Sequence, residues 1–299
     1  MGELPFSESF LRRLEVLAVL YRRAIASQMQ GERRSTKRGQ SVEFSDFRPY
    51  VPGDDFRRID WNAFARLERL FIKLFVEEED LTVHLLIDTS NSMNWGQPSK
   101  LEYAIKTASA VGYVALVGLD RVTATALGCE KLSAKNYFPP KRGKKAALSL
   151  FTFLQSLSSI IPSENGRSTA TWLSSYAASA KQPGPLLIFS DLMNDGWRQG
   201  INFIGGRNFE ISLLHILAPD EVNPDLRGDF KLIDSENKLG VEITADFETL
   251  ERYRMRVKAW QESWRVYCRA RGMHYLPIET SLPLEELLYA KLPRHGVLR

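Results

Sequence analysis

The clearest indication of the fold comes from residues 83–93, which read Val83-His-Leu-Leu-Ile-Asp-Thr-Ser-Asn-Ser-Met93. Its first half is apolar at almost every position, which predicts a strand buried on both faces of a parallel sheet. The strand ends in Asp88, and Ser90 and Ser92 follow at alternate positions. A carboxylate and two hydroxyls on a tight loop at the carboxyl end of such a strand are hard oxygen ligands of the kind that Mg²⁺ prefers. An ordinary strand exit, where Asp and Ser cap turns, gives the same local pattern and stays open as the alternative.

A second stretch repeats this arrangement farther along the chain. Leu186-Leu-Ile-Phe-Ser-Asp191 again has the character of a buried strand, and it also ends in a carboxylate. Two buried strands that each end in oxygen ligands strengthen the interpretation as a site for Mg²⁺ or Mn²⁺. The alternative is that the two loop exits are unrelated.

The composition is that of a globular protein. The chain has 299 residues, of which 44% are hydrophobic, so it can bury a large core. The longest uninterrupted apolar stretch, near 111–119, is well short of the ~20 residues of a membrane-spanning helix, and the first residues lack the order of a secretory signal. Two cysteines are too few for a disulfide framework or a zinc site. We therefore expect a cytoplasmic protein with no direct membrane span.

Hydrophobic periodicity predicts helices that alternate with strands over most of the chain. We expect strands at 71–76, 83–87, 120–127, 186–190, 210–217 and 274–278, a hairpin at 230–233 and 240–243, and helices at 7–30, 99–118, 146–157, 171–180, 197–206, 247–272 and 283–292. Residues 128–143, with Pro139-Pro140, are expected to form a loop.

This alternation predicts an α/β fold with a doubly wound, mostly parallel sheet and helices on both faces. We expect that domain to span residues 81–299. Residues 1–80 are expected to add an N-terminal helix, which should pack on the main body, and a small β-containing annex.

The segment that precedes the sheet is rich in interleaved charged and aromatic residues. Its candidate partner-binding residues are Arg48, Tyr50, Asp54, Asp55, Arg57 and Trp61. One interpretation is a charge-paired ledge that fastens the segment to the main domain. The other is a recognition surface, because aromatic and arginine side chains are the usual anchors of interfaces.

A family resemblance rests on the order of these motifs. The run Arg48-Pro-Tyr-Val-Pro-Gly-Asp-Asp-Phe-Arg-Arg-Ile-Asp-Trp61, followed by Ala65-Arg66 and then by Asp88-Thr-Ser-Asn-Ser-Met93, resembles the bacterial family called domain of unknown function 58. The Asp-x-Ser-x-Ser pattern at 88–92 is similar to the metal-ion-dependent adhesion site of von Willebrand factor A-type domains.

The resemblance implies a von Willebrand A-like domain whose metal shell extends beyond the first loop. In such a domain Asp191 reaches the ion held by Asp88, Ser90 and Ser92, and a Thr joins the shell. Here that residue is Thr169 or, alternatively, Ser168. The resemblance also implies frequent association with MoxR-type AAA ATPases, but no established activity.

We therefore expect a metal-dependent protein-protein interaction module, an adaptor that works with a MoxR-type ATPase in the assembly or activation of other proteins. A partner's carboxylate would take the open coordination position of the ion. We do not expect an enzyme, because the four histidines are scattered and the sequence has no Walker loop or dinucleotide fingerprint. Binding of nucleic acid or another anionic surface through the basic residues of 12–38 and the 141–145 loop is the alternative, although nucleic acid is the less favoured partner. A cryptic hydrolase at the same metal is a third hypothesis.

Overall fold

The computed structural model describes residues 5–31, 42–77, 81–128, 135–160, 168–180, 182–194, 196–233 and 240–297. The chain divides into two compact units. Met1–Ser27 and Leu81–Arg299 form the main unit, and Gln28–Asp80 form a second, smaller unit. The expected division at residue 80 grouped the first helix with the annex, whereas the contacts place this helix as far as Ser27 with the main unit.

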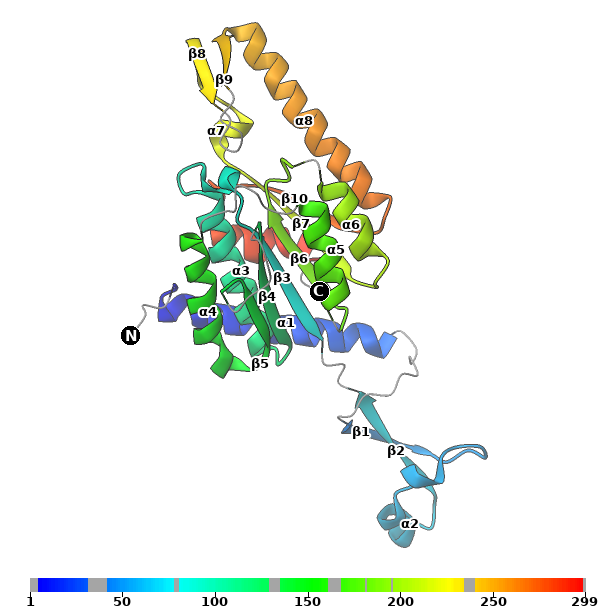
Figure 1. The fold of residues 1–299 in the computed structure, drawn as a ribbon. Coiled ribbons are helices and arrows are strands. Elements are labelled where there is room, and N and C mark those ends of the chain that lie inside the picture. The colour runs from blue at the N-terminus through cyan, green and yellow to red at the C-terminus, as the bar shows by residue number, and fades with distance from the viewer. Residues whose placement is uncertain are drawn as a thin grey trace. The chain divides into compact units, whose positions relative to one another are not determined.

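The main unit is built on a mixed six-stranded sheet, so the predicted α/β class is confirmed (Figure 1). The strand order is β10-β7-β6-β3-β4-β5. The bounds are β3 (Thr82–Asp88), β4 (Arg121–Leu127), β5 (Tyr137–Arg142), β6 (Pro185–Ser190), β7 (Glu210–Leu217) and β10 (His274–Glu279). Every neighbouring pair is parallel except β4 and β5, which are antiparallel.

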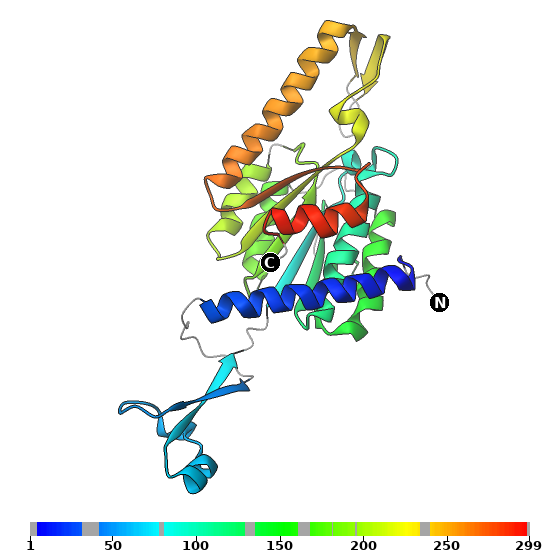
Figure 2. The same cartoon turned by 180° about the vertical axis from the view of Figure 1, so that it is seen from behind.

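Helices cover both faces of this sheet, and the alternation of side chains along the strands determines what each face buries. On β3, Val83, Leu85 and Ile87 join one apolar cluster, which also takes in α1, α3, α4 and the C-terminal helical segment. Leu86 points the other way and joins a cluster with α5, α6 and α8. Figure 2 shows α1 and the C-terminal helical segment lying across the face that α3 and α4 also cover.

The helices of the main unit follow the predicted periodicity closely. They are α1 (Glu8–Gly31), α3 (Lys100–Val117), α4 (Ala147–Ser156), α5 (Thr169–Ser179), α6 (Trp197–Gly205), α7 (Pro219–Val222), α8 (Phe247–Arg269), α9 (Leu284–Glu286) and α10 (Leu292–Arg294). Short 3₁₀ turns lie at Asn91–Asn94 (η2), Lys144–Ala146 (η3) and Leu157–Ser159 (η4), and a π-helical turn at Leu287–Lys291 joins α9 to α10. Within the described ranges no helix is long and apolar enough to cross a bilayer.

Two antiparallel hairpins complete the fold. In the main unit, β8 (Gly228–Ile233) pairs with β9 (Gly240–Ala245) just before α8. In the second unit, β1 (Val42–Pro49) pairs with β2 (Phe71–Glu77), and the connection between them carries the 3₁₀ turn η1 (Phe56–Arg58) and the helix α2 (Trp61–Leu67).

Candidate metal-binding site

The loop after β3 is held by its own side chains. The backbone N–H and the hydroxyl of Thr89 both donate to the carbonyl oxygen of Leu127 at the end of β4, at 3.1 and 2.5 Å. Met93 is fully buried and anchors the η2 turn. Between these two anchors Ser90 and Ser92 are half-buried, with their hydroxyl oxygens 3.1 Å apart.

The loop after β6 lies at the same edge of the sheet. Ile87 of β3 pairs with Phe189 of β6, so Asp88 and Ser190 are neighbours where the two strands end. The Ser190 hydroxyl donates to one carboxylate oxygen of Asp88 at 2.5 Å, and the backbone N–H of Ser90 donates to the other at 3.0 Å. The predicted oxygen ligands of the two strands are therefore brought together, and Ser190 is a further member that sequence reasoning did not assign.

Two buried carboxylates repel each other at this edge. Asp88 and Asp191 are 4% and 1% exposed. Burial, and then the charge of Asp191, raise the pKa of Asp88 to about 6, against the opposing effect of the hydrogen bonds from Ser190 and Ser90. Since both carboxylates are buried at adjacent strand ends, a positive charge near them is favourable.

Lys100 supplies one such charge. Its side chain is completely buried at the start of α3, and its ammonium donates to Asp191 at 2.8 Å and to Glu221 of α7 at 2.5 Å. Glu221 also accepts a hydrogen bond from the backbone N–H of Ala218 at 2.8 Å. Sequence reasoning missed both Lys100 and Glu221, because lysine is almost always exposed and neither residue carries a local signal.

The backbone beyond Asp191 is strained. Leu192 is a buried leucine with a φ of 55°, in the left-handed region that a side chain of this size rarely adopts. Its N–H donates to the Ser190 hydroxyl at 2.9 Å, which holds the turn in place. Strain of this kind costs about 1–3 kcal/mol and is concentrated at binding and catalytic sites.

The structure distinguishes the two hydroxyl residues at the start of α5. Ser168 is the N-cap, and its side chain accepts from the N–H of Thr171 at 3.3 Å. Thr169 is half-buried and lies beside the loop that follows β6, since a Cβ on Gly196 would be 3.4 Å from the Cβ of Thr169. Within the described ranges the Thr169 hydroxyl makes no hydrogen bond to the four predicted ligands Asp88, Ser90, Ser92 and Asp191.

The candidate partner-binding residues lie in the second unit and take different roles there. The Arg48 guanidinium pairs with Asp54 at 2.6 Å, and the Asp55 carboxylate accepts from the N–H of Arg57 at 3.0 Å and so caps η1. Three aromatic and basic members of the set remain at least partly accessible. These are Tyr50, Arg57 and Trp61.

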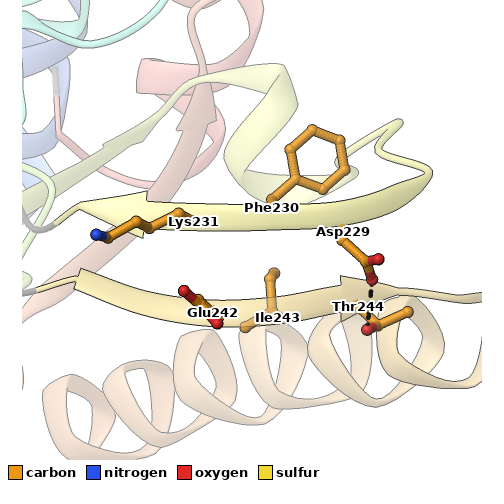
Figure 3. A pocket seen from close by; sticks show the side chains of 6 residues that line it. All are labelled: Asp229, Phe230, Lys231, Glu242, Ile243 and Thr244. Atoms are coloured by element: carbon orange, nitrogen blue, oxygen red, sulfur yellow. Dashed lines mark hydrogen bonds between the residues drawn. The ribbon is translucent and has the colours of Figure 1, made fainter.

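In the main unit a pocket lies on the β8–β9 hairpin. Figure 3 shows the six side chains that line it: Asp229, Phe230, Lys231, Glu242, Ile243 and Thr244. The Thr244 hydroxyl donates to Asp229 at 2.7 Å. None of the predicted ligands contributes to this pocket.

Comparison with known proteins finds relatives of unassigned activity. The chain is 23% identical over 237 residues to uncharacterized proteins of Mycobacterium tuberculosis (Rv1480) and Mycobacterium bovis (Mb1516), a match that covers 78% of this chain and 73% of each relative. Among solved structures it is similar to the conserved hypothetical protein BatB from Bacteroides thetaiotaomicron, with 16% identity and a TM-score of 0.42. It is also similar to an aerotolerance-related membrane protein from Bacteroides fragilis, with 16% identity and a TM-score of 0.45. Both structural matches cover 72% of this chain and 98% of the other.

The family comparison covers most of the chain. The model of the family described as "Protein of unknown function DUF58" matches residues 46–263, which include the second unit's motif and both strand exits of the candidate site. The chain therefore belongs to the DUF58 family.

Proposed function

We propose that this protein is a metal-dependent protein-recognition module with a von Willebrand A-like, doubly wound domain, in which the exits of β3 and β6 hold Mg²⁺ or Mn²⁺. The observation that carries the proposal is the pair of buried carboxylates at neighbouring strand ends, Asp88 and Asp191, with the hydroxyls of Ser90 and Ser92 on the first loop. The strained turn at Leu192 adds support, because such strain is concentrated where a site must be held in shape.

The charge and the oxygen donors at this edge favour a divalent cation. Asp88 and Asp191 end neighbouring strands and Glu221 shares the Lys100 ammonium with Asp191, so three carboxylates and one ammonium leave two unbalanced negative charges when all are ionised. Among the described residues no three His, Cys, Asp or Glu side chains are placed to hold an ion together, so in this proposal the serine hydroxyls are direct ligands. Carboxylate and hydroxyl oxygens are the ligand types that Mg²⁺ prefers. One carboxylate oxygen of Asp191 already accepts a hydrogen bond from the Lys100 ammonium. This arrangement suits a carboxylate that contacts the ion through water.

The proposal assigns a role to each residue. The half-buried Ser90 and Ser92 provide hydroxyl oxygens as ligands, and the buried Asp88 and Asp191 provide negative charge. Thr169 is the better candidate for the remaining hydroxyl, since Ser168 is used as the cap of α5. When bound, the ion supplies a positive charge with one coordination position open to a carboxylate of a partner.

The partner in this proposal is a protein that presents an Asp or Glu. The family resemblance suggests a MoxR-type AAA ATPase, or a protein delivered to one, so the molecule would act as an adaptor rather than as an enzyme. We favour this over binding of an anionic surface because three basic side chains of the first helix and of the 141–145 loop have carboxylate partners. The pairs are Arg12 with Glu8 at 2.9 Å, Arg13 with Glu285 at 2.5 Å and Lys144 with Glu15 at 2.7 Å.

Calorimetric titration with Mg²⁺ and with Mn²⁺ tests the proposal. We expect saturable binding to the wild type and none to the Asp88→Ala, Ser90→Ala double variant. The matched control is Asp229→Ala, Thr244→Ala, which also removes one carboxylate and one hydroxyl but in the β8–β9 hairpin. Near-ultraviolet circular dichroism of each variant verifies that it is folded.

The titration is repeated with acetate present, since an ion with an open position binds more tightly when a carboxylate completes its shell. Absence of binding under both conditions contradicts the proposal, as does binding that survives in the double variant. Affinity for DNA that falls steeply with salt and ignores Mg²⁺ would favour the anionic-surface alternative instead.

A further inference from the structure

The second unit contains a helix that the rest of this unit does not bury. The helix α2 is seven residues long, and none of its residues is buried. It is held by the Asp60 carboxylate, which accepts from the N–H groups of Asn62 and Ala63 at 2.9 and 3.2 Å. Isolated helices of this length are unstable in water, and most helical stability comes from the packing of an apolar face. The Asp60 cap fixes where α2 begins. The apolar face of α2 is not packed against other described residues of this unit.

Large apolar side chains gather on this helix and on the turn before it. Trp61, Phe64 and Leu67 recur at every third residue of α2 and are 61%, 41% and 60% exposed, and Phe56 of η1 is 66% exposed. The Trp61 and Phe64 rings meet edge to face at 6.2 Å, so they form one patch. Exposed apolar side chains scattered singly are ordinary, whereas adjacent exposed aromatic rings mark interaction sites.

The aspartates and the arginines of this segment differ in their partners. Asp54, Asp55 and Asp60 are turned toward their own segment, where they pair with Arg48 or accept from backbone N–H groups. Three basic side chains of the same segment are exposed and make no ion pair among the described residues: Arg57, Arg66 and Arg69. Glu68 is exposed between them.

We propose that Phe56, Trp61, Phe64 and Leu67, with Arg57, Arg66 and Arg69, form a docking surface for an acidic, leucine-rich or aromatic-rich segment of another protein. We refer to these seven residues as the aromatic–arginine surface. Aromatic and arginine residues are the usual anchors of protein interfaces, and outward arginines complement a partner's carboxylates. The exposed Glu68 within the surface would be repelled by an anionic lipid sheet, so mixed charge favours a protein partner over a membrane. The proposal does not depend on a metal ion.

Fluorine NMR on the full chain labelled with 5-fluorotryptophan tests the surface directly. The chain has six tryptophans, and Trp61→Phe identifies the Trp61 resonance. The probe is a synthetic helical peptide in which leucine recurs at helical spacing between glutamates, and its counterpart has glutamine in place of glutamate. We expect the glutamate peptide to shift the Trp61 resonance saturably and the glutamine peptide to bind about tenfold more weakly.

Charge-matched variants make the test specific. Arg66→Gln, Arg69→Gln should weaken binding of the glutamate peptide about tenfold. Arg252→Gln, Arg256→Gln on the exposed side of α8 should leave it unchanged. Unaltered resonances of the other five tryptophans verify that each variant is folded.

Four results would overturn the proposal. They are an unshifted Trp61 resonance at saturating glutamate peptide, equal binding of the glutamine peptide, a response only to vesicles of phosphatidylcholine with phosphatidylglycerol, and a Trp61 shift produced by raising the protein concentration alone. The last two would assign the surface to a membrane and to a second copy of the chain, respectively.

Discussion

At the scale of single residues, Lys100 is the least expected feature of the candidate site. A lysine ammonium with no solvent access is tolerated only when carboxylates surround it, and here Asp191 and Glu221 do so from two different elements. Through Glu221 it ties the end of β6 to α7, and the Tyr253 hydroxyl of α8 donates to the Glu221 carbonyl oxygen at 2.7 Å. One side chain thus links the site to the segment that carries the β8–β9 hairpin.

Lys100→Met should lower the free energy of unfolding by about 3–5 kcal/mol, because it leaves two carboxylates buried without their counter-charge. Urea denaturation followed by circular dichroism measures the loss. The control is Lys106→Met on the same helix, whose pair with Glu102 is solvent-exposed and should be worth only about 0.3–0.5 kcal/mol. Equal small losses for both variants would show that the buried pair does not stabilise the fold.

The sequence predicts the carboxylates at the ends of the strands but not the residues that bind or pair with them. Asp88 and Asp191 follow apolar runs, so burial of those runs determines where their carboxylates emerge. Ser190, Lys100 and Glu221 reach the site only through strand pairing and helix packing between segments far apart in the chain. Periodicity carries no information about such pairings. Lysine is almost always exposed in proteins, so the sequence alone predicts an exposed Lys100.

At the scale of elements, the loop predicted for residues 128–143 was wrong for residues 137–142. Within this range, Tyr137–Arg142 form β5, an antiparallel edge strand. Pro139 and Pro140 argue against a central strand but are tolerated at an edge, where an N–H is not required. Only Phe138 of the strand is buried, so the alternation that would reveal it is missing. One continuous helix was predicted at 283–292. In the structure a π-helical turn at Leu287–Lys291 separates α9 from α10.

The spacing between β3 and β6 depends on a glycine. A Cβ on Gly184, just before β6, would lie 2.4 Å from the backbone carbonyl oxygen of Thr82 at the start of β3. Gly184→Ala must therefore push two neighbouring strands apart, and we expect a loss of about 1–3 kcal/mol in the free energy of unfolding.

Thermal and urea denaturation compare this variant with Gly205→Ala. A Cβ on Gly205, the last residue of α6, would meet no atom within 4 Å, so that change should be neutral or stabilise the fold by up to about 1 kcal/mol. An unaltered stability of Gly184→Ala would show that the strand ends adapt more easily than their packing suggests.

At the scale of the whole molecule, resistance to acid depends on buried neutral histidines. The His84 ring is hydrogen-bonded to the Tyr176 hydroxyl at 2.5 Å and to the Gln182 carbonyl oxygen at 3.0 Å. Burial lowers the pKa of His84 to about 4, and burial lowers that of His215 to about 4 as well. Unfolded histidine binds a proton below about pH 6.5, so the unfolded state takes up more protons between those values. Stability from these groups is complete above pH 6.5 and is lost as the pH falls toward 4.

We expect His84 alone to cost about 2 kcal/mol of stability between pH 7.5 and pH 5. Urea denaturation across this range should give a steeper pH dependence for the wild type than for His84→Gln, which cannot titrate. His274→Gln, at a half-buried position at the start of β10, is the comparison. Parallel curves for the wild type and His84→Gln would contradict a depressed pKa in the folded state.

The main unit is discontinuous in sequence, because residues 28–80 of the second unit separate its first helix from its sheet. This order has a consequence for synthesis on the ribosome. The first helix joins the cluster of α3 and α4, where Phe6 meets Phe151 at 5.9 Å and Glu15 accepts from the Tyr113 hydroxyl at 2.7 Å. At about 5–20 residues per second, about 7–28 s separate translation of the start of α1 from translation of the start of α4. During that interval the nascent helix exposes Phe10, Leu14 and Leu17 before the residues that bury them are made, which gives a chaperone an apolar segment to bind.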